Sequence, residues 1–228
     1  MLRLAESLGD ASKVVQRRAA EALVRLAGRG REIRTLLVRM LAEAPPRGRW
    51  GAVFALSLLD DAVPEEALPV LAAALAADDG DVRWAACDIL VRRTAAWSEG
   101  AARALQDLAL NGDLRQRRMA LYALRDLDRR GRDSENAARR AVVESDSDLR
   151  LAGMAALARL ADDRLAAARD IAALLTDADL RVRRAAAGTL GMLGCRDPAV
   201  CAALTGAATD ADASTARAAR RALQRLEE

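Results

Sequence analysis

The chain has 228 residues, enough for one or two ordinary globular domains. Hydrophobic residues make up 52% of it but aromatic residues only 2%, so alanine and leucine must fill the interior, which favours helices and argues against a β fold. The 36 basic and 33 acidic residues nearly balance, and the absence of histidine removes the usual near-neutral acid–base group and the commonest metal ligand.

Apolar stretches with helical periodicity follow one another along the chain in pairs. The first member of a pair is clearest in IRTLLVRMLAEA from Ile33, in LPVLAAALAAD from Leu68 and in RDIAALLTD from Arg169. Each such stretch precedes a second, longer one after a short polar turn. The chain is therefore predicted to fold as a series of helix pairs, each consisting of a helix A, a turn and a helix B.

Prolines and capping residues mark where several of these helices begin. Pro45 and Pro46 open helix B of the second pair, and Asp197 followed by Pro198 predicts an N-cap with proline at the first helical position. Pro69 falls one turn into a predicted helix, where its ring and its missing N–H should kink the helix or delay its start.

Each helix B carries a leucine that recurs every 33 or 34 residues along the whole chain. These leucines are Leu23, Leu56, Leu90, Leu124, Leu157, Leu190 and Leu223. Four residues before each of them stands a small residue, at Ala19, Ala52, Ala86, Ala120, Gly153, Ala186 and Ala219. This spacing places both columns on one helical stripe, with small residues that allow close helix approach. The sequence predicts seven repeats stacked as a single domain over residues 1–228.

The clearest copy of the repeat is DADLRVRRAAAGTLGMLG, residues 177–194. It resembles the bacterial HEAT-like repeat, which is also found in phycobilisome lyases. The residues that carry the resemblance are Asp177, Asp179, Val182, Arg183, Ala185, Ala186, Leu190, Gly191, Leu193 and Gly194. The resemblance covers nearly the whole chain and implies an all-α fold, an α–α superhelix (HEAT-like solenoid) of about seven two-helix repeats. It is specific for the fold and says almost nothing about activity.

An aspartate and an arginine four residues apart recur at the start of helix B. The pairs are Asp79 and Arg83, Asp113 and Arg117, Asp146 and Arg150, and Asp179 and Arg183. The acidic residue suits the positive end of the helix, and the arginine can pair along the helix or with the next repeat. We interpret these residues as structural.

The side of helix B that faces away from the packed stripe is where a partner would bind, because in related solenoids it lines the concave surface. This side holds the positions six before, two before and one after the recurring leucine. In the first four repeats they include Arg17, Trp50, Phe54, Trp84, Asp88, Arg118, Tyr122 and Arg125. Aromatic and arginine side chains clustered on an exposed face are typical of binding hot spots. The alternative is that these large residues only fill a tightly curved groove.

The leading functional hypothesis is a non-catalytic protein-interaction scaffold. The helix B segments carry a net positive charge and the remaining segments a net negative one. We therefore expect the face to bind an acidic or extended protein partner.

Two other classes stay open at this point. DNA-alkylation-repeat glycosylases are also HEAT-like solenoids with a basic concave face, and they use tryptophan, aspartate and arginine to hold a cationic base. Trp84, Asp88 and Arg118 or Arg125 form a comparable set of residue types, with Asp88 as the only candidate for a chemical role. The motif register of those enzymes is not matched, and the low net charge argues against tight duplex binding. The lyase-like repeats also raise the possibility of tetrapyrrole chaperoning.

Cofactors, metals and membranes are not expected. The three cysteines, Cys87, Cys195 and Cys201, form no CxxC pair and are predicted to be buried, reduced thiols. The N-terminal stretch has no apolar core of the kind found in signal peptides, and no run of 18 apolar residues occurs. The sequence therefore predicts a soluble, cytoplasmic protein without a metal or a cofactor.

Overall fold

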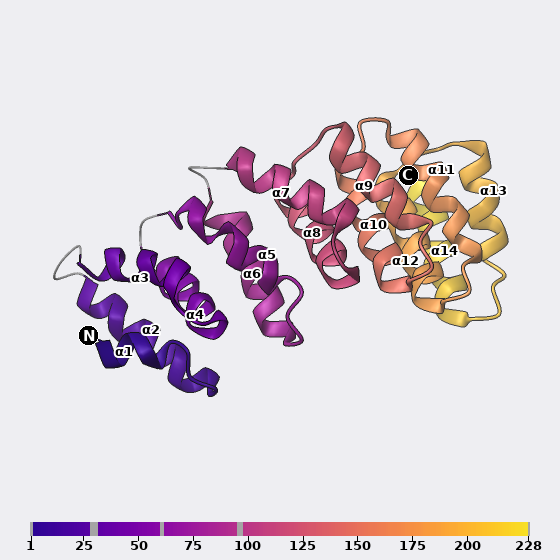
Figure 1. Cartoon of the computed structure of the whole chain (residues 1–228). Helices are drawn as coiled ribbons and strands as arrows, with labels where there is room; N and C mark the ends of the chain where they lie inside the picture. The colour runs from indigo at the N-terminus through magenta and orange to yellow at the C-terminus, as the bar shows by residue number, and fades with distance from the viewer. Residues whose placement is uncertain (1, 28–31, 60–61, 95–97, 228) are drawn as a thin grey trace. The chain divides into compact units, whose positions relative to one another are not determined.

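The computed structural model describes residues 2–27, 32–59, 62–94 and 98–227. All regular structure in these ranges is helical, which confirms the predicted all-α class (Figure 1). The chain divides into two compact units, Met1–Ala104 and Leu105–Glu228, and each is described by itself. The prediction of a single domain stays a prediction. None of the described helices has the length and apolarity needed to cross a membrane.

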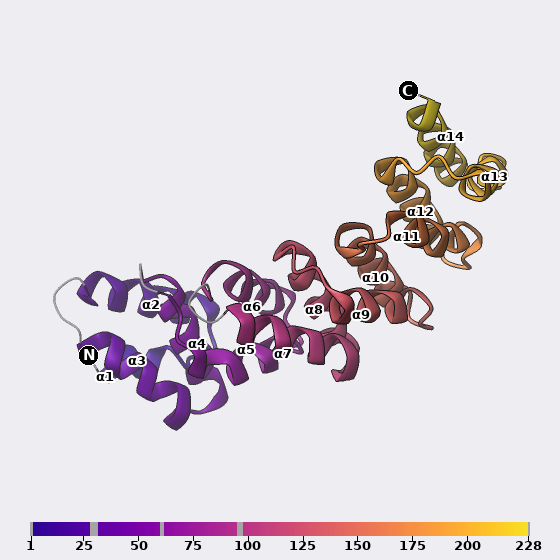
Figure 2. The ribbon, with the colours of Figure 1, turned by 90° about the horizontal axis from the view of Figure 1, so that it is seen from above.

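Unit 1 contains three helix pairs. The A helices are α1 (Leu2–Ser7), α3 (Glu32–Glu43) and α5 (Leu68–Ala74), and the B helices are α2 (Lys13–Ala27), α4 (Pro46–Ser57) and α6 (Gly80–Arg92). A 3₁₀ turn, η1 (Glu65–Ala67), precedes α5. Figure 2 shows α2, α4 and α6 in one row and α1, α3 and α5 in a second row beside it. Helix α7 (Ser98–Asn111) crosses the boundary between the units.

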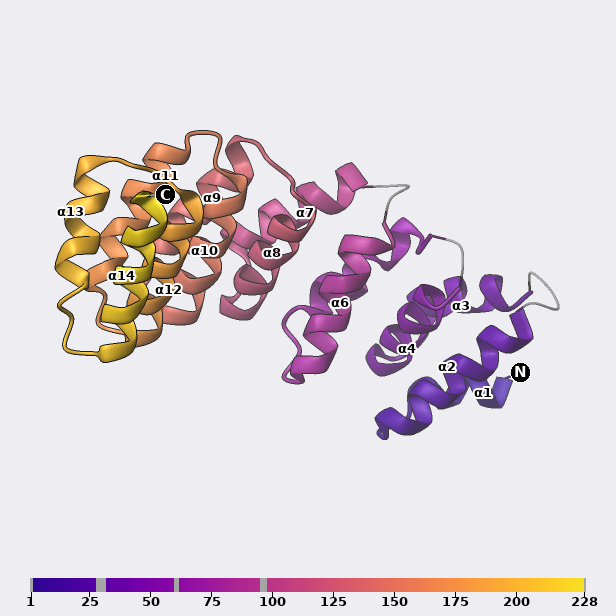
Figure 3. The same cartoon turned by 180° about the vertical axis from the view of Figure 1, so that it is seen from behind.

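Unit 2 continues the same pattern. Its B helices are α8 (Leu114–Asp126), α10 (Ser147–Leu160), α12 (Leu180–Leu193) and α14 (Ala213–Glu227). Its A helices are α9 (Arg132–Val142), α11 (Arg164–Ala172) and α13 (Pro198–Ala207), and the 3₁₀ turn η3 (Ala173–Thr176) extends α11. Figure 3 shows the four B helices following one another in order. With α7 as the A helix of α8, the seven predicted repeats are all present.

The recurring leucine and the small residue before it form the core of each repeat, as predicted. Six of the seven leucines are at most 1% exposed, and Leu223 on α14 is partly buried. All seven small residues are buried. Gly153 shows why the column must be small, since a Cβ atom there would lie 2.6 Å from the Cβ of Ala141 on α9.

The predicted helix starts are also confirmed. Pro45 is the N-cap of α4, with Pro46 in the first turn. Pro69 lies in the first turn of α5, which begins only after η1, so the proline delays the α-helix. The side chain of Asp197 caps α13 by accepting hydrogen bonds from the backbone N–H groups of Ala199 (3.2 Å) and Val200 (3.3 Å).

The aspartate and arginine at the start of helix B have separate structural roles. Asp79, Asp113, Asp146 and Asp179 each accept a backbone hydrogen bond as N-caps of their helices. Three of the arginines instead reach the next repeat, where they pair with a carboxylate. These inter-repeat pairs, which we call staples, are Arg117–Glu144 (2.6 Å), Arg150–Asp177 (2.7 Å) and Arg183–Asp210 (2.8 Å).

All three staples lie in unit 2, and the sequence explains why none joins the described residues of unit 1. The staple carboxylate stands 13 residues before the recurring leucine of its repeat, and in the third repeat this position is Ala77. Arg49, at the matching arginine position of the second repeat, therefore finds no carboxylate there and donates its Nε–H to the carbonyl of Ala44 (2.7 Å). In the first repeat Gln16 replaces the arginine.

Candidate binding face and cavity

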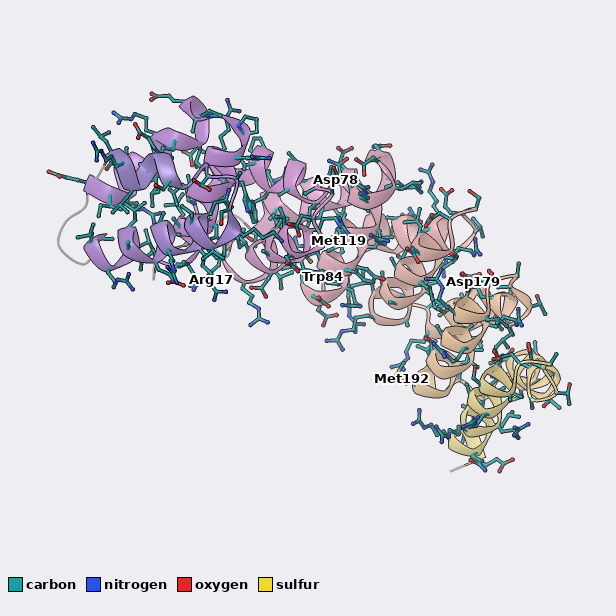
Figure 4. The ribbon with its side chains drawn as sticks, turned by 90° about the horizontal axis from the view of Figure 1, so that it is seen from below. Arg17, Asp78, Trp84, Met119, Asp179 and Met192 are labelled. Carbon is teal, nitrogen blue, oxygen red and sulfur yellow. The ribbon has the colours of Figure 1, made fainter. Side chains whose placement is uncertain are left out.

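The part of the predicted binding face that lies in unit 1 presents one strongly exposed aromatic residue. Trp84 on α6 is 52% exposed, whereas Trp50 and Phe54 on α4 are half-buried. Arg17 on α2 is exposed and pairs with Glu21 (3.3 Å). Arg17 and Trp84 lie along the same side of unit 1 (Figure 4).

Asp88 is the predicted residue with a possible chemical role. It lies one turn after Trp84 on α6 and is exposed, and its carboxylate forms an ion pair of 2.5 Å with Arg92 on the same helix. An exposed pair of this kind contributes little energy to the stability of the helix.

The part of the predicted face in unit 2 is electrostatically satisfied. Arg118 pairs with Asp148 (2.8 Å), and Arg125 pairs with Asp126 (2.7 Å) while its guanidinium lies 5.1 Å from the centre of the Tyr122 ring. Burial raises the pKa of the Tyr122 hydroxyl. The arginines of this face are thus held by neighbouring side chains, and a partner would have to compete with those neighbours.

The structure groups the predicted site residues by unit. Arg17, Trp50, Phe54, Trp84 and Asp88 belong to unit 1, and Arg118, Tyr122 and Arg125 belong to unit 2. That all eight residues bind one partner therefore stays a prediction.

A cavity of about 1040 Å³ lies between the second and third repeats of unit 1, and sequence reasoning did not predict it. Trp50 is the one residue of the predicted face that lines it. The other lining residues come from α3, α4, η1, α5, the starts of α2 and α6 and the turns before α2 and α6. Most are apolar, and they include Val38, Leu41, Pro46, Pro69, Val70, Ala73, Ala77 and Val82. The sequence feature that could have indicated this cavity is Ala77, which stands where the staples have a carboxylate.

Lys13 connects the first repeat to the third repeat beside this cavity. The ammonium group of Lys13, at the start of α2, pairs with Asp79 and with Asp81 (3.0 Å for Asp81) at the start of α6. The hydrogen bond from Lys13 lowers the pKa of Asp79, and Asp79 in turn raises the pKa of Lys13. Lys13 and Asp79 both line the cavity, so the negative charge of Asp79 is already neutralised there.

The cysteines and acidic residues form no metal site in the ranges that the structure describes. Cys87 is buried as predicted, but Cys195 and Cys201 are only half-buried, because they lie at the surface around the start of α13. None of the three forms a disulfide bond among the described residues.

Stacked helix pairs that share one leucine stripe and are joined by arginine–carboxylate staples define an α-helical repeat protein. A sequence profile of HEAT repeats matches residues 2–90, 33–125 and 136–224. The chain belongs to the HEAT-repeat family, as the resemblance of its repeats implied. No curated protein sequence matches it.

Solved structures show the same fold at low sequence identity. The chain is similar to an archaeal HEAT-like repeats protein from Thermococcus onnurineus NA1, with 17% identity and a TM-score of 0.60 over 99% of this chain and 96% of that one. It is also similar to an engineered protein (19% identity, TM-score 0.54, covering 99% of this chain and 67% of that one). A designed armadillo repeat protein in complex with the peptide (KR)4 gives 14% identity and a TM-score of 0.51 over 98% of both chains.

Proposed function

We propose that this HEAT-repeat protein is a non-catalytic scaffold that binds an acidic or extended protein segment on the outward side of its B helices. The observation that carries the proposal is the exposure of Trp84, which is 52% exposed in the middle of α6 although stacking of the repeats does not require an aromatic residue there. Tryptophan is the residue most enriched among binding hot spots, because it offers a large, rigid contact area.

The state of the charged groups bears on the choice between a protein partner and a nucleic acid. Arg118 and Arg125 are paired with Asp148 and Asp126, so a nucleic acid and an acidic protein would both have to displace these carboxylates. Asp88 is exposed and paired with Arg92, which does not suit a carboxylate that must act on a cationic base in an enclosed pocket. The designed armadillo protein holds a peptide on a fold of this kind, although that peptide is basic.

The proposal can be tested by affinity capture from a cell extract with the purified chain as bait. We expect the variant Trp84→Ala to lose a captured protein by at least about tenfold, as is usual for a truncated hot spot. Val143→Ala is the matched control, since Val143 is 82% exposed but lies just after an A helix. Capture that is unchanged in the Trp84→Ala variant would overturn the site assignment. Steep, salt-dependent binding of duplex DNA in fluorescence anisotropy would favour the nucleic-acid alternative instead.

A further inference from the structure

The cavity between the second and third repeats lies where the repeat architecture is interrupted. In unit 2 consecutive B helices pack directly against one another, as α8, α10, α12 and α14 do. In unit 1 α4 packs mainly against α2, α3 and α5, and the staple position opposite Arg49 is Ala77. The cavity lies where this carboxylate is missing and the contact between consecutive B helices is looser.

The size and lining of this cavity are those of a ligand site. The cavity is partly open to solvent, and its volume of about 1040 Å³ lies at the upper end of the range for small-molecule pockets. The walls between α3 and α5 are formed by Val38, Leu41, Val70 and Ala73, so an apolar group would be stabilised there.

Two arginines give this apolar cavity a cationic end. Arg47 and Arg49, in the first turn of α4, both line the cavity, and neither forms an ion pair among the described residues. The N-terminus of α4 adds to the positive potential, because Pro45 stands where α6, α8, α10 and α12 have a capping aspartate, and its side chain accepts no hydrogen bond.

The acidic residues of the lining do not cancel this cationic end. Asp79 is paired with Lys13. Asp78 lies next to it and also has an interaction partner, and Glu66 is on η1, at the beginning of the third A helix. Neither Asp78 nor Glu66 forms an ion pair with Arg47 or Arg49 among the described residues, so both guanidinium groups are left without an acidic partner there.

We propose that this cavity binds a small amphipathic acid, a molecule with an apolar chain or ring and one carboxylate. The carboxylate accepts hydrogen bonds from the guanidinium groups of Arg47 and Arg49, and the apolar part lies between α3 and α5 beside the Trp50 ring. The guanidinium fork matches a carboxylate in geometry and in charge. Trp50 is the one residue that this ligand site shares with the predicted partner-binding face, and the ligand proposal does not depend on the scaffold function.

Titration calorimetry of the full chain with decanoate, and with decanol as the uncharged analogue, tests the proposal. We expect decanoate to bind with a stoichiometry of one and about tenfold more tightly than decanol, because charge-assisted hydrogen bonds to two arginines are available only to the carboxylate. In the double variant Arg47→Ala, Arg49→Ala this preference should disappear. Arg39→Ala is the matched control, since Arg39 lies on α3, is exposed and does not line the cavity.

A second variant tests whether the binding occurs in the cavity. Ala73→Leu adds volume to the wall on α5 and should weaken decanoate at least about tenfold, with retention of the fold checked by circular dichroism. Equal affinity for decanoate and decanol, a preference that survives loss of both arginines, or no binding at millimolar decanoate would each overturn the proposal. The affinity-capture result for Trp84 would be unaffected by any of these outcomes, so failure of one proposal is distinguishable from failure of the other.

Discussion

Arg150 illustrates how one side chain can close a repeat and join it to the next. Its Nη1 donates to the carbonyls of Glu144 and Ser145 in its own turn (2.7 Å each). Its Nε and Nη2 form a two-point pair with Asp177 of the following repeat, at 2.7 and 2.8 Å. The Arg150 side chain is 13% exposed and that of Asp177 is 8% exposed, so the pair is screened much less than a surface ion pair.

Removing this staple should destabilise unit 2 strongly. We expect Arg150→Ala to lower the free energy of unfolding by about 3 kcal/mol, because it leaves the carboxylate of Asp177 enclosed without its partner. Arg150→Lys should restore little, since an ammonium group cannot make the two-point pair and reach both carbonyls. Urea unfolding followed by circular dichroism measures the difference. Arg184→Ala is the control, because Arg184 is an exposed arginine. An equal loss of unfolding free energy in Arg150→Ala and Arg184→Ala would contradict the stabilising role of the Arg150–Asp177 staple.

Asp212 makes the stability of unit 2 depend on pH in the acid range. Hydrogen bonds from the Ser214 hydroxyl, from the Thr215 N–H and from the Thr215 hydroxyl lower the pKa of Asp212 from 3.8 to about 2. Since the folded pKa lies below the unfolded one, the stabilisation is present above about pH 4 and is lost as the pH falls towards about 2. Asp212→Asn keeps an oxygen acceptor for the cap but cannot titrate.

The variant Asp212→Asn should therefore show a shallower loss of stability on acidification than the natural chain. Thermal unfolding of the natural chain and of the variant at several pH values between about 4 and 2 measures this difference. All other titrating groups are the same in the two proteins, so the difference reports on Asp212 alone. Parallel curves across that range would show that Asp212 does not contribute.

At the scale of a helix, two glycines of α12 stand three residues apart and should respond oppositely to the same change. A Cβ atom at Gly191 would lie 2.9 Å from the Cα and 3.0 Å from the Cβ of Ala222 on α14, whereas a Cβ atom at Gly188 meets nothing within 4 Å. We expect Gly191→Ala to destabilise by about 1–3 kcal/mol through overpacking. Gly188→Ala should stabilise by about 0.5–1 kcal/mol through helix propensity. Melting temperatures that shift in the same direction for both variants would disprove this.

The helices and their phase could be predicted from the sequence because each depends on local chemistry. The leucine and small-residue columns, the delay at Pro69 and the cap at Asp197 all follow from residues within one turn of the feature. The partner of the repeated arginine could not be settled in this way, because pairing along the helix and pairing with the next repeat suit the same spacing. That choice depends on the geometry between repeats.

At the scale of the whole chain, the staples divide the repeats into two kinds. Three staples join the repeats of unit 2, and none joins those of unit 1 among the described residues. We expect the backbone amides of α10 and α12 to exchange hydrogen more slowly than those of α4 and α6, because local opening is easier where repeats are held by fewer contacts. Hydrogen exchange followed by mass spectrometry measures this helix by helix. Slower exchange in α4 than in α10 would contradict the expectation.

The candidate site was predictable only in part. The exposure of Trp84 follows from its helical phase, since it lies opposite the buried stripe. The half-burial of Trp50 and the pairing of Arg118 with Asp148 do not follow, because they depend on which side chains neighbouring repeats present. The cavity lies beside Ala77, which stands where the staples have a carboxylate. This substitution can be recognised in the sequence only when the role of the staple carboxylate is already known.

The staples also give the row of repeats a direction. The fifth and sixth repeats each present a carboxylate to the repeat before and an arginine to the repeat after, as the sixth repeat does with Asp177 and Arg183. The arginine of one such repeat can therefore pair with the carboxylate of any other such repeat placed directly after it. A second copy of residues 177–209 placed after Thr209 would find an arginine before it and a carboxylate after it. Insertion or deletion of whole repeats in this part of the molecule would leave no staple charge unpaired. The same does not hold for the second and third repeats, which no staple joins among the described residues.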